Sequence, residues 1–384
     1  MTAIDKTLLE NLRLFEEAKR LKDAGFITVD QIAEAKRQLD LPKTNANVLV
    51  RIGFFLLGSF LYSSLTGFLS LILLDFGSHY KIMLFIYAFI GIGVCEFLAS
   101  KNYYAFGLDD AFILGSQAVL CAAIGVAFES VTVYFAAMGI FGFLYCVRYA
   151  NTISVLFGVI GVSGFFASLF INELSSTALL PFVMLFVALG LFFSSRKLSV
   201  IQDSNLTHNS LGVIKAASLV LGYLSVNYLI VRELSEELLN VVVRPGQDIP
   251  FAYLFYAFTF LIPPFFLFYS IKSKDRMFFI IGLLAVAFSV FTIRFYYSLM
   301  PIEIALVIGG AALFAASYFF IRKIRDKDTG LTYKPDRYTD SEALSYAQAI
   351  IVSSQSHIKT VETIESPMPF GGGGFSGGGS GGNY

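Results

Sequence analysis

Residues 151–172 read NTISVLFGVIGVSGFFASLFIN and contain no Asp, Glu, Lys or Arg. A helix of about 20 apolar residues crosses the roughly 30 Å hydrocarbon core of a bilayer, and it satisfies its own backbone polar groups. The stretch is therefore predicted to be a transmembrane helix. Gly158, Gly161 and Gly164 lie along it and allow a neighbouring helix to approach closely.

Other stretches of the chain share this length and apolar character. They are 49–73, 80–100, 109–128, 131–149, 177–195, 211–231, 251–271, 277–297 and 301–321. The whole chain is 56% hydrophobic and only 15% charged, against roughly 25% charged residues in soluble domains. The expected fold is all-α: a polytopic transmembrane bundle of about ten spans over residues 47–321.

The charge balance and the motifs exclude several classes of function. The chain carries 28 basic and 28 acidic residues, so no bulk field attracts nucleic acid. Cys95, Cys121 and Cys146 lie in apolar runs without metal-ligand spacing, and we expect no disulfide, metal or cofactor. Neither hydrolase motifs nor a phosphate-binding loop occurs in the sequence. We therefore expect a protein that is not an enzyme.

The distribution of Lys and Arg predicts the orientation in the membrane. With a cytoplasmic amino terminus, the inner flanks carry Arg51, Lys101, Arg148, Arg196, Lys197, Lys215, Lys272, Lys274, Arg276, Arg322, Lys323 and Arg325. The outer flanks carry Lys81, Arg232, Arg244 and Arg294. Both termini are therefore expected in the cytoplasm, with the spans in the bacterial cytoplasmic (inner) membrane and the lipid bilayer as their partner.

Residues 1–46 are predicted to form a soluble helical hairpin. One apolar stripe runs along residues 7–24, and its members are Leu8, Leu12, Phe15, Ala18 and Leu21. At a second helix start, Thr28 and Gln31 have the spacing of a capping box, and Ile27 and Ile32 that of a hydrophobic staple. We expect this stripe, including Leu12, Phe15 and Ile32, to pack against the hairpin itself or the membrane domain. The alternative is a separate protein partner.

The stretch RLKDAGFITVDQIAEAKRQLDL in this hairpin resembles the short C-terminal domain, a small helical hairpin. It is also similar to the amino-terminal hairpin of a broad group of bacterial multi-spanning inner-membrane proteins of unknown function. The resemblance implies an interaction or oligomerisation element.

A few polar or helix-breaking residues fall inside the expected spans. Glu96 lies near the cytoplasmic end of one span, beside Lys101, and Gln117 lies nearer the middle of another. Arg294 could pair with Glu303 across the last hairpin, and Asn227 lies near an outer end. Pro263 and Pro264 interrupt the eighth span and free backbone carbonyls, which either line a cavity or are covered by a neighbouring helix. We expect interface snorkelling or helix packing at these positions, with a solute path as the alternative.

The chain ends in two polar segments. Residues 322–369 contain one expected helix, which starts at a capping box formed by Thr339 and Glu342. Residues 370–384 are Gly-rich and are expected to be a disordered coil similar to the tails of some TPM-domain membrane proteins. Phe370, Phe375 and Tyr384 are its aromatic residues and its candidate contacts with a cytoplasmic partner.

Two hypotheses remain open at this point. The first is a non-enzymatic membrane assembly or interaction protein, with the hairpin and the tail as its contact elements. It accounts for the scarcity of charge at the centre of the spans. The second is a secondary transporter or channel for a small zwitterionic or apolar solute, or a lipid, that uses Gln117 and the interrupted eighth span. A water-accessible or lipid-sized cavity beside Pro263 and Gln117 would discriminate between them.

Overall fold

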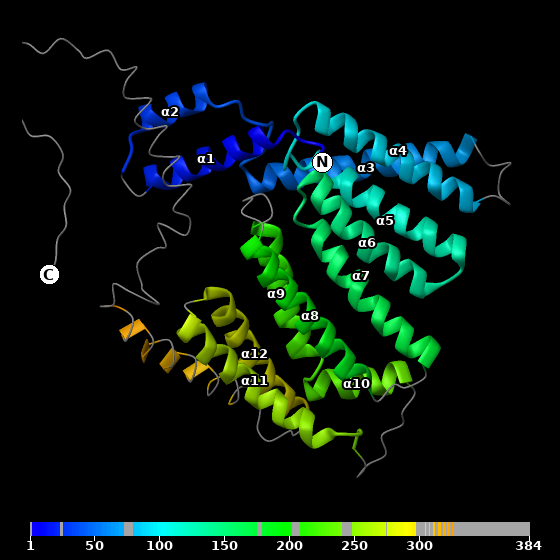
Figure 1. Cartoon of the computed structure of the whole chain (residues 1–384), viewed down its shortest axis with the longest axis vertical. Helices are drawn as coiled ribbons and strands as arrows, with labels where there is room; N and C mark the ends of the chain where they lie inside the picture. Colours follow the sequence, from blue (N-terminus) through cyan, green and yellow to red (C-terminus); the bar gives the residue numbers. More distant parts are fainter. Residues whose placement is uncertain are drawn as a thin grey trace, which may run out of the picture. The chain divides into compact units, whose positions relative to one another are not determined.

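The computed structural model describes most of the chain, and its described residues form two compact units (Figure 1). The described residues are 2–23, 26–72, 80–174, 179–201, 208–239, 248–273 and 275–296, with single positions 304, 307, 310, 311, 314, 315, 318, 319, 321, 322 and 325. The larger unit, here called the membrane unit, comprises the described residues within Met1–Arg13 and Asp40–Thr339. The smaller, here called the hairpin unit, is described over Leu14–Leu39.

The structure is built of helices. They are α1 (Lys6–Asp23), α2 (Val29–Gln38), α3 (Val48–Ile72), α4 (Tyr80–Ser100), α5 (Leu108–Phe128), α6 (Val131–Tyr149), α7 (Ser154–Leu169), the π-helical turn η2 (Phe170–Leu174), α8 (Leu180–Ile201), α9 (His208–Leu224), α10 (Tyr228–Leu239), α11 (Ala252–Ser273) and α12 (Arg276–Tyr296). The all-α prediction is confirmed for these residues.

Seven of these helices are long and apolar enough to cross a membrane, namely α3 to α8 and α11. The count is eight if α9 and α10 form one span, but these helices meet at a bend of 72°. The predicted continuous span 211–231 is therefore broken. The predicted span 301–321 lies largely outside the described residues, and the count of ten remains a prediction.

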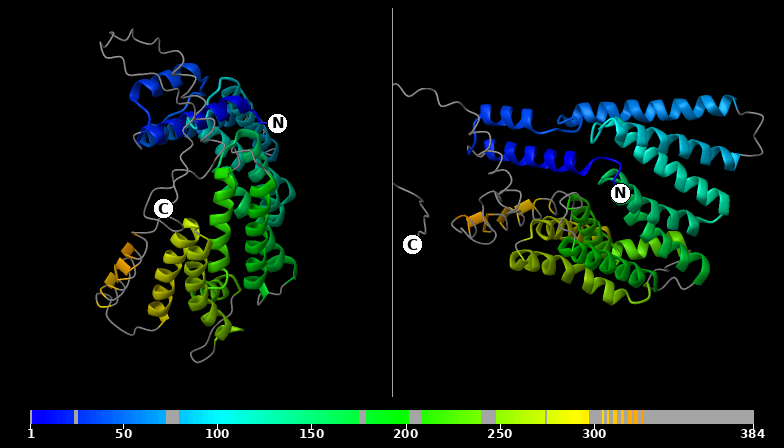
Figure 2. Two further views of the ribbon diagram at one scale, coloured as in Figure 1. Left: turned by 60° about the vertical axis from the view of Figure 1, so that its left-hand side comes forward. Right: turned by 45° about the horizontal axis from the view of Figure 1, so that its top comes forward.

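The helices of the membrane unit pack mainly in an ordered row (Figure 1, Figure 2). Helices α3 and α4 both pack on α5, which packs on α6, and α6 packs on α7. Helix α7 contacts α8 and α9, while α12 joins α9 to α11. Among the spans, α5 is the most buried and α3 the least. The interior of the part of the membrane unit formed by α3, α4, α5 and α6 is therefore organised around α5.

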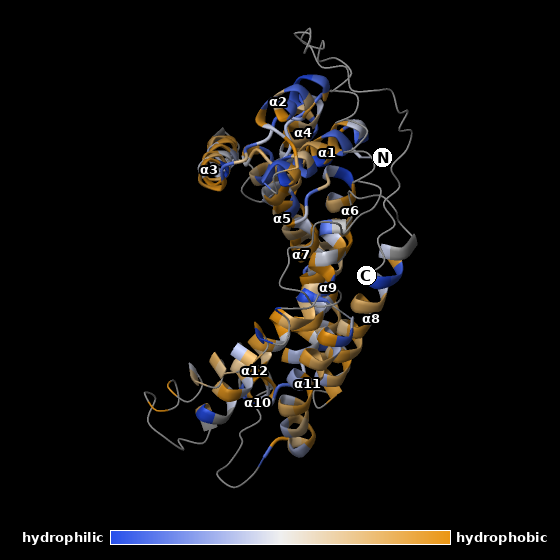
Figure 3. Ribbon diagram, turned by 90° about the vertical axis from the view of Figure 1, so that its left-hand side faces the viewer, coloured by the Kyte–Doolittle hydropathy of each residue, from blue (hydrophilic) through white to orange (hydrophobic). Residues whose placement is uncertain are grey.

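The outer surfaces of the spans are apolar, as Figure 3 shows for α3. On α3 alone, Leu49 is 78% exposed and Phe60 is 68% exposed. Side chains of this size are stable in such positions when lipid covers them, because the bilayer core is itself apolar. The chain is therefore a multi-pass integral membrane protein in contact with the lipid bilayer.

The hairpin unit follows the local signals of its sequence. Thr28 caps α2: its backbone N–H donates to Gln31 Oε1 at 2.8 Å, and the Gln31 N–H donates to its hydroxyl at 3.3 Å. Ile32 packs on the buried residues Ala18, Leu21 and Ile27, so helix α2 covers part of the apolar stripe of α1. The predicted capping box is confirmed.

Two of the closest helix contacts are made by glycines of α6 and α7. A Cβ atom added to Gly142 would overlap the backbone of Gly158, and one added to Gly161 would overlap the backbone of Gly139. Because backbone lies on both sides, no side-chain movement relieves such an overlap. These glycines set the distance between α6 and α7.

Gly161→Ala should therefore destabilise the membrane unit by about 1–3 kcal/mol, the usual cost of forcing an extra methyl group into a packed interior. The matched control is Gly93→Ala on α4, where an added Cβ meets no atom within 4 Å. The control should be neutral or stabilising because Ala favours helix. Thermal unfolding in detergent, followed by size-exclusion chromatography, measures both, and equal shifts in Tm would contradict the close contact.

Candidate functional site

The candidate site is built at the end of the membrane unit where α4 ends and α5 begins. The linker before α3 pairs with the α4–α5 loop: Lys43 N donates to Asn102 O at 2.8 Å, and Tyr104 N donates to Lys43 O at 3.1 Å. The amide Nδ2 of Asn45 donates to Phe106 O at 2.7 Å. The loop is thus held by main-chain and amide hydrogen bonds.

Gly107 brings this loop against the first turn of α3. Its φ is +107°, and a Cβ atom there would overlap the carbonyl of Arg51 and lie 3.1 Å from the Cβ of Phe54. Only glycine combines this backbone conformation with so close an approach. The loop therefore fixes where α5 starts relative to α3.

Two adjacent carboxylates open α5, and both are buried. Asp109 is 4% exposed, and its Oδ1 accepts the backbone N–H groups of Phe106 at 3.0 Å and Gly107 at 2.9 Å. Its charge also lies at the helix end where the macrodipole favours an anion. Asp109 thus stabilises the loop–helix junction.

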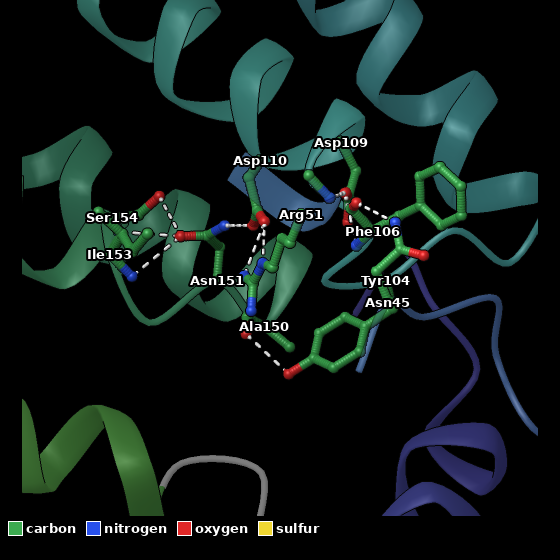
Figure 4. Close-up of polar contacts among 11 residues, drawn as sticks. Asn45, Arg51, Tyr104, Phe106, Asp109, Asp110, Ala150, Asn151, Ile153 and Ser154 are labelled. Atoms are coloured by element: carbon green, nitrogen blue, oxygen red, sulfur yellow. Dashed lines mark hydrogen bonds and ion pairs between the residues drawn. The ribbon is translucent and has the colours of Figure 1, made fainter. Parts of the chain in front are cut away.

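Asp110, which is 3% exposed, links three helices (Figure 4). Its Oδ2 accepts two hydrogen bonds from Arg51 of α3, from Nε at 2.8 Å and from an Nη at 2.7 Å. Its Oδ1 accepts from Asn151 Nδ2 at 2.8 Å, and Asn151 Oδ1 accepts from the Ser154 N–H at 3.1 Å at the start of α7. Arg51, Asp109, Asp110 and Asn151 are here called the Asp110 cluster.

The polar contacts of this cluster hold α3, α5 and the start of α7 in position. Each carboxylate accepts hydrogen bonds from protein donors, and two nitrogens of the Arg51 guanidinium donate to the same Asp110 oxygen. Over the described residues, no group of three or more His, Cys, Asp or Glu side chains is arranged to hold a metal ion. A buried pair of this kind is expensive to break, because removing one partner leaves an uncompensated charge.

A second ion pair holds α4 to α6 at the same end. Glu96 accepts from Arg148 Nε at 3.0 Å and from its Nη2 at 2.7 Å, and from the Tyr149 hydroxyl at 2.9 Å. Glu96 thus pairs with Arg148 of α6. Lys101 follows Glu96 closely in the sequence, and its Nζ lies 5.9 Å from the centre of the Phe97 ring.

The carbonyl that Pro263 frees in α11 accepts a hydrogen bond from a neighbouring helix. Pro263 is buried and has no N–H to donate to Thr259 O, one turn earlier in the helix. Ser289 Oγ of α12 donates to that carbonyl at 2.7 Å instead. Of the two alternatives at this proline, the structure shows coverage by a neighbouring helix. Pro264 also lies within α11.

The break between α9 and α10 is closed by side chains of the protein. Asn227 Oδ1 accepts the Leu229 N–H at 3.1 Å, while its Nδ2 donates to the Tyr223 hydroxyl at 3.0 Å. The Tyr228 N–H donates to Thr259 Oγ1 at 2.9 Å. The start of α10 is therefore capped within the protein.

The other predicted positions are dispersed. Gln117 lies fully buried in α5, and its amide atoms have no partner among the described residues. Arg294 is in the last turn of α12, and Glu303 lies outside the described residues, so their pair remains a prediction. Phe15 is buried, while Leu12 and Ile32 are partly buried in the two helices of the hairpin. Phe370, Phe375 and Tyr384 lie outside the described residues.

The sequence reasoning missed the Asp110 cluster. From sequence, Arg51 is only a flanking charge, and Asp109 and Asp110 fall at the start of the predicted span 109–128. The available signal was a pair of acidic residues opening an apolar stretch, because such a pair must be capped or neutralised at the membrane boundary.

Asp110→Ala should destabilise the protein by about 3 kcal/mol, the lower end of the cost of breaking a buried pair, because the Arg51 side chain stays 38% exposed and can turn to water. The double variant Arg51→Met/Asp110→Leu should recover part of this loss, since it removes both charges. Thermal unfolding in detergent gives the comparison.

The control is Glu129→Gln, which breaks an exposed pair. Lys81 donates to Glu129 Oε1 at 2.5 Å and lowers the pKa of that carboxyl, but the Glu129 side chain is 78% exposed, so water screens the pair. Tm should change little. A Tm for Asp110→Ala as high as that of Glu129→Gln would show that the cluster does not hold the helices.

No protein-family model, curated protein or solved structure matches this chain.

Proposed function

We propose that this chain is a non-enzymatic protein of the bacterial inner membrane that assembles with another protein through its hairpin unit, with both termini in the cytoplasm. The observation that carries the proposal is how the residues flanking the hairpin unit are attached. Ala3 N donates to Arg148 O at 2.6 Å, and Ile4 and Leu9 pack on Ala99. On the other side of the hairpin, Lys43 pairs with the α4–α5 loop.

This attachment supports an interaction role because the segments before and after the hairpin unit are both held within the membrane unit. Both flanking segments belong to the membrane unit and are bound at the end that carries the Asp110 cluster. A short helical hairpin on a free linker would lose much of its binding free energy to ordering on contact with a partner. Attachment at both ends reduces that loss.

The cytoplasmic placement rests on charge. Arg51, Lys101 and Arg148 flank α3, α4 and α6 at this same end, and they belong to the larger of the two sets of Lys and Arg. Such residues favour the cytoplasmic side of a membrane. The hairpin is therefore assigned to the cytoplasm together with this end.

The contact surface proposed for the partner is the start of α2. Phe26 is 54% exposed and Val29 is 67% exposed, on either side of buried Ile27 and the capping residue Thr28. The capping box fixes this turn, so the two apolar side chains are presented without further ordering. The predicted contacts of the tail, Phe370, Phe375 and Tyr384, belong to the same proposal as a second contact element.

Phe26→Ser/Val29→Ser should remove a stoichiometric partner that co-purifies with the full-length chain in mild detergent. Quantitative mass spectrometry against a tag-only sample provides the measurement, and Lys36→Ser on the exposed part of α2 is the matched control. Deletion of residues 370–384 tests the tail separately. A wild-type chain without any stoichiometric partner, or equal recovery from all variants, would argue against the assembly role.

The second candidate, a transporter or channel for a small zwitterionic or apolar solute or a lipid, is favoured by one observation. The Gln117 amide is buried in a span and has no hydrogen-bond partner among the residues that the structure describes. Against it, the carbonyl freed by Pro263 is occupied by Ser289.

Cysteine labelling separates the candidates. Gln117→Cys and Pro263→Cys should both resist a membrane-impermeant thiol reagent if the interior is closed, and the native cysteines are buried and serve as the unreactive background. A Glu129→Cys variant, in the turn between α5 and α6 where the side chain is 78% exposed, is the positive control. Rapid labelling at both interior positions would favour transport.

A further inference from the structure

The helices α8, α9, α11 and α12 carry a surplus of positive charge at one end. The segments 196–215 and 272–276, which contain the end of α8, the start of α9 and the junction of α11 with α12, hold six Lys or Arg residues and two Asp residues. By contrast, Arg51 and Arg148, at the end that carries the Asp110 cluster, are each paired with a carboxylate. The surplus therefore belongs to this part of the membrane unit.

Contacts around Phe278 bring the four helices together at this end. Phe278 is buried in the first turn of α12, and its ring centre lies 4.7 Å from that of Tyr269 in α11 and 5.7 Å from that of Phe192 in α8. Lys215 of α9 donates to Asp275, which precedes α12, and its Nζ lies 5.5 Å from the centre of the Phe278 ring. The charged ends of all four helices thus lie close together.

Helices α8 and α11 run parallel to each other. Phe182 packs on Phe255 near one end, with ring centres 5.6 Å apart, and Arg196 Nη1 donates to the Tyr269 hydroxyl at 3.2 Å near the other. Arg196 and Tyr269 each follow the corresponding residue of the first pair by 14 positions. The two helices therefore remain neighbours along this length, and their line of contact is here called the α8–α11 seam.

Exposed aromatic rings lie on the membrane side of the Arg196–Tyr269 hydrogen bond. Phe193, three residues before Arg196, is 60% exposed. Phe265, four residues before Tyr269, is 57% exposed, and the centres of these two rings are 6.2 Å apart. Residues three or four positions apart share one face of a helix. The seam thus combines a cation with apolar surface one turn deeper in the membrane.

Two lysines repeat this arrangement beside the seam. Lys197 follows Phe193 by four residues, and Lys272 follows the exposed Phe268 by four. Both lysines are exposed, and neither makes a hydrogen bond or an ion pair with another described residue. A cation one turn beyond an exposed apolar side chain matches a phospholipid, whose phosphate lies at the interface above its acyl chains.

We propose that the α8–α11 seam binds an anionic phospholipid. Arg196, Lys197 and Lys272 contact its phosphate, and its acyl chains lie against Phe193 and Phe265. The Arg196 guanidinium has five N–H donors, so donors remain for a phosphate after its bond to Tyr269. The surplus of positive charge favours a headgroup with net negative charge, and the apolar rings favour a lipid over a soluble phosphate ester. This site is independent of the proposed assembly through the hairpin.

Native mass spectrometry of the full-length protein in non-ionic detergent tests the proposal. The protein is titrated with dioleoylphosphatidylglycerol and, separately, with dioleoylphosphatidylcholine, and the lipids bound per chain are counted. The anionic lipid should bind at least about tenfold more tightly. In Lys197→Gln/Lys272→Gln its affinity should fall about 30-fold, as expected for the loss of two lysines near an anionic headgroup, while binding of phosphatidylcholine stays unchanged.

The matched control is Lys36→Gln/Lys101→Gln, which removes the same charge from exposed positions outside the seam. It should keep the wild-type affinity for phosphatidylglycerol. Equal affinities of the two double variants for this lipid, or equal binding of both lipids by the wild-type protein, overturn the proposal. Glycerol 3-phosphate, which has the phosphate without acyl chains, should not bind. If it binds as tightly as phosphatidylglycerol, the seam is a site for soluble phosphate esters and the lipid proposal is wrong.

Discussion

Inside a bilayer, each backbone donor and acceptor must be satisfied by the protein, because no solvent is present to replace a lost hydrogen bond. This constraint explains the irregular parts of the membrane unit. Where α9 ends and α10 begins, Asn227 and Thr259 accept hydrogen bonds from buried N–H groups that have no acceptor within their own helix. Where Pro263 removes a donor, Ser289 supplies one. The backbone groups at these two places are thus hydrogen-bonded within the protein.

The same constraint, that buried polar groups need partners within the protein, applies to the end of the unit that carries the Asp110 cluster. A carboxylate buried at a membrane boundary is stable only when its partners are fixed, and these partners come from α3 and from the turn before α7. The backbone approach of α6 to α7, through Gly142 and Gly158, then fixes the neighbouring pair without polar atoms. Ion pairs and hydrogen bonds thus hold some neighbouring helices of the row together, and close glycine packing holds α6 to α7.

Local patterns predicted much of this structure. The limits of α3 to α6 and the cap at Thr28 were accessible from sequence because length, apolarity and capping act over a few residues. The Asp110 cluster was not accessible, since its partners lie 59 and 41 residues away along the chain. The same is true of Glu96, whose partner Arg148 is 52 residues away. The bend of 72° after α9 was missed because the stretch 211–231 is long and mostly apolar, although Asn227 marks the bend.

The short turns around α6 have a consequence for the biogenesis of the protein. Helices α5 and α6 are joined by two residues and α6 and α7 by four, so neither turn can cross the bilayer apart from its helices. These helices must therefore enter the membrane as hairpins. Arg51 has already been synthesised when Asp110 emerges from the ribosome, whereas Asn151 emerges later. The Asp110 carboxylate can therefore pair with Arg51 of α3 during insertion. Its hydrogen bond with Asn151 forms later, when the turn before α7 has been synthesised.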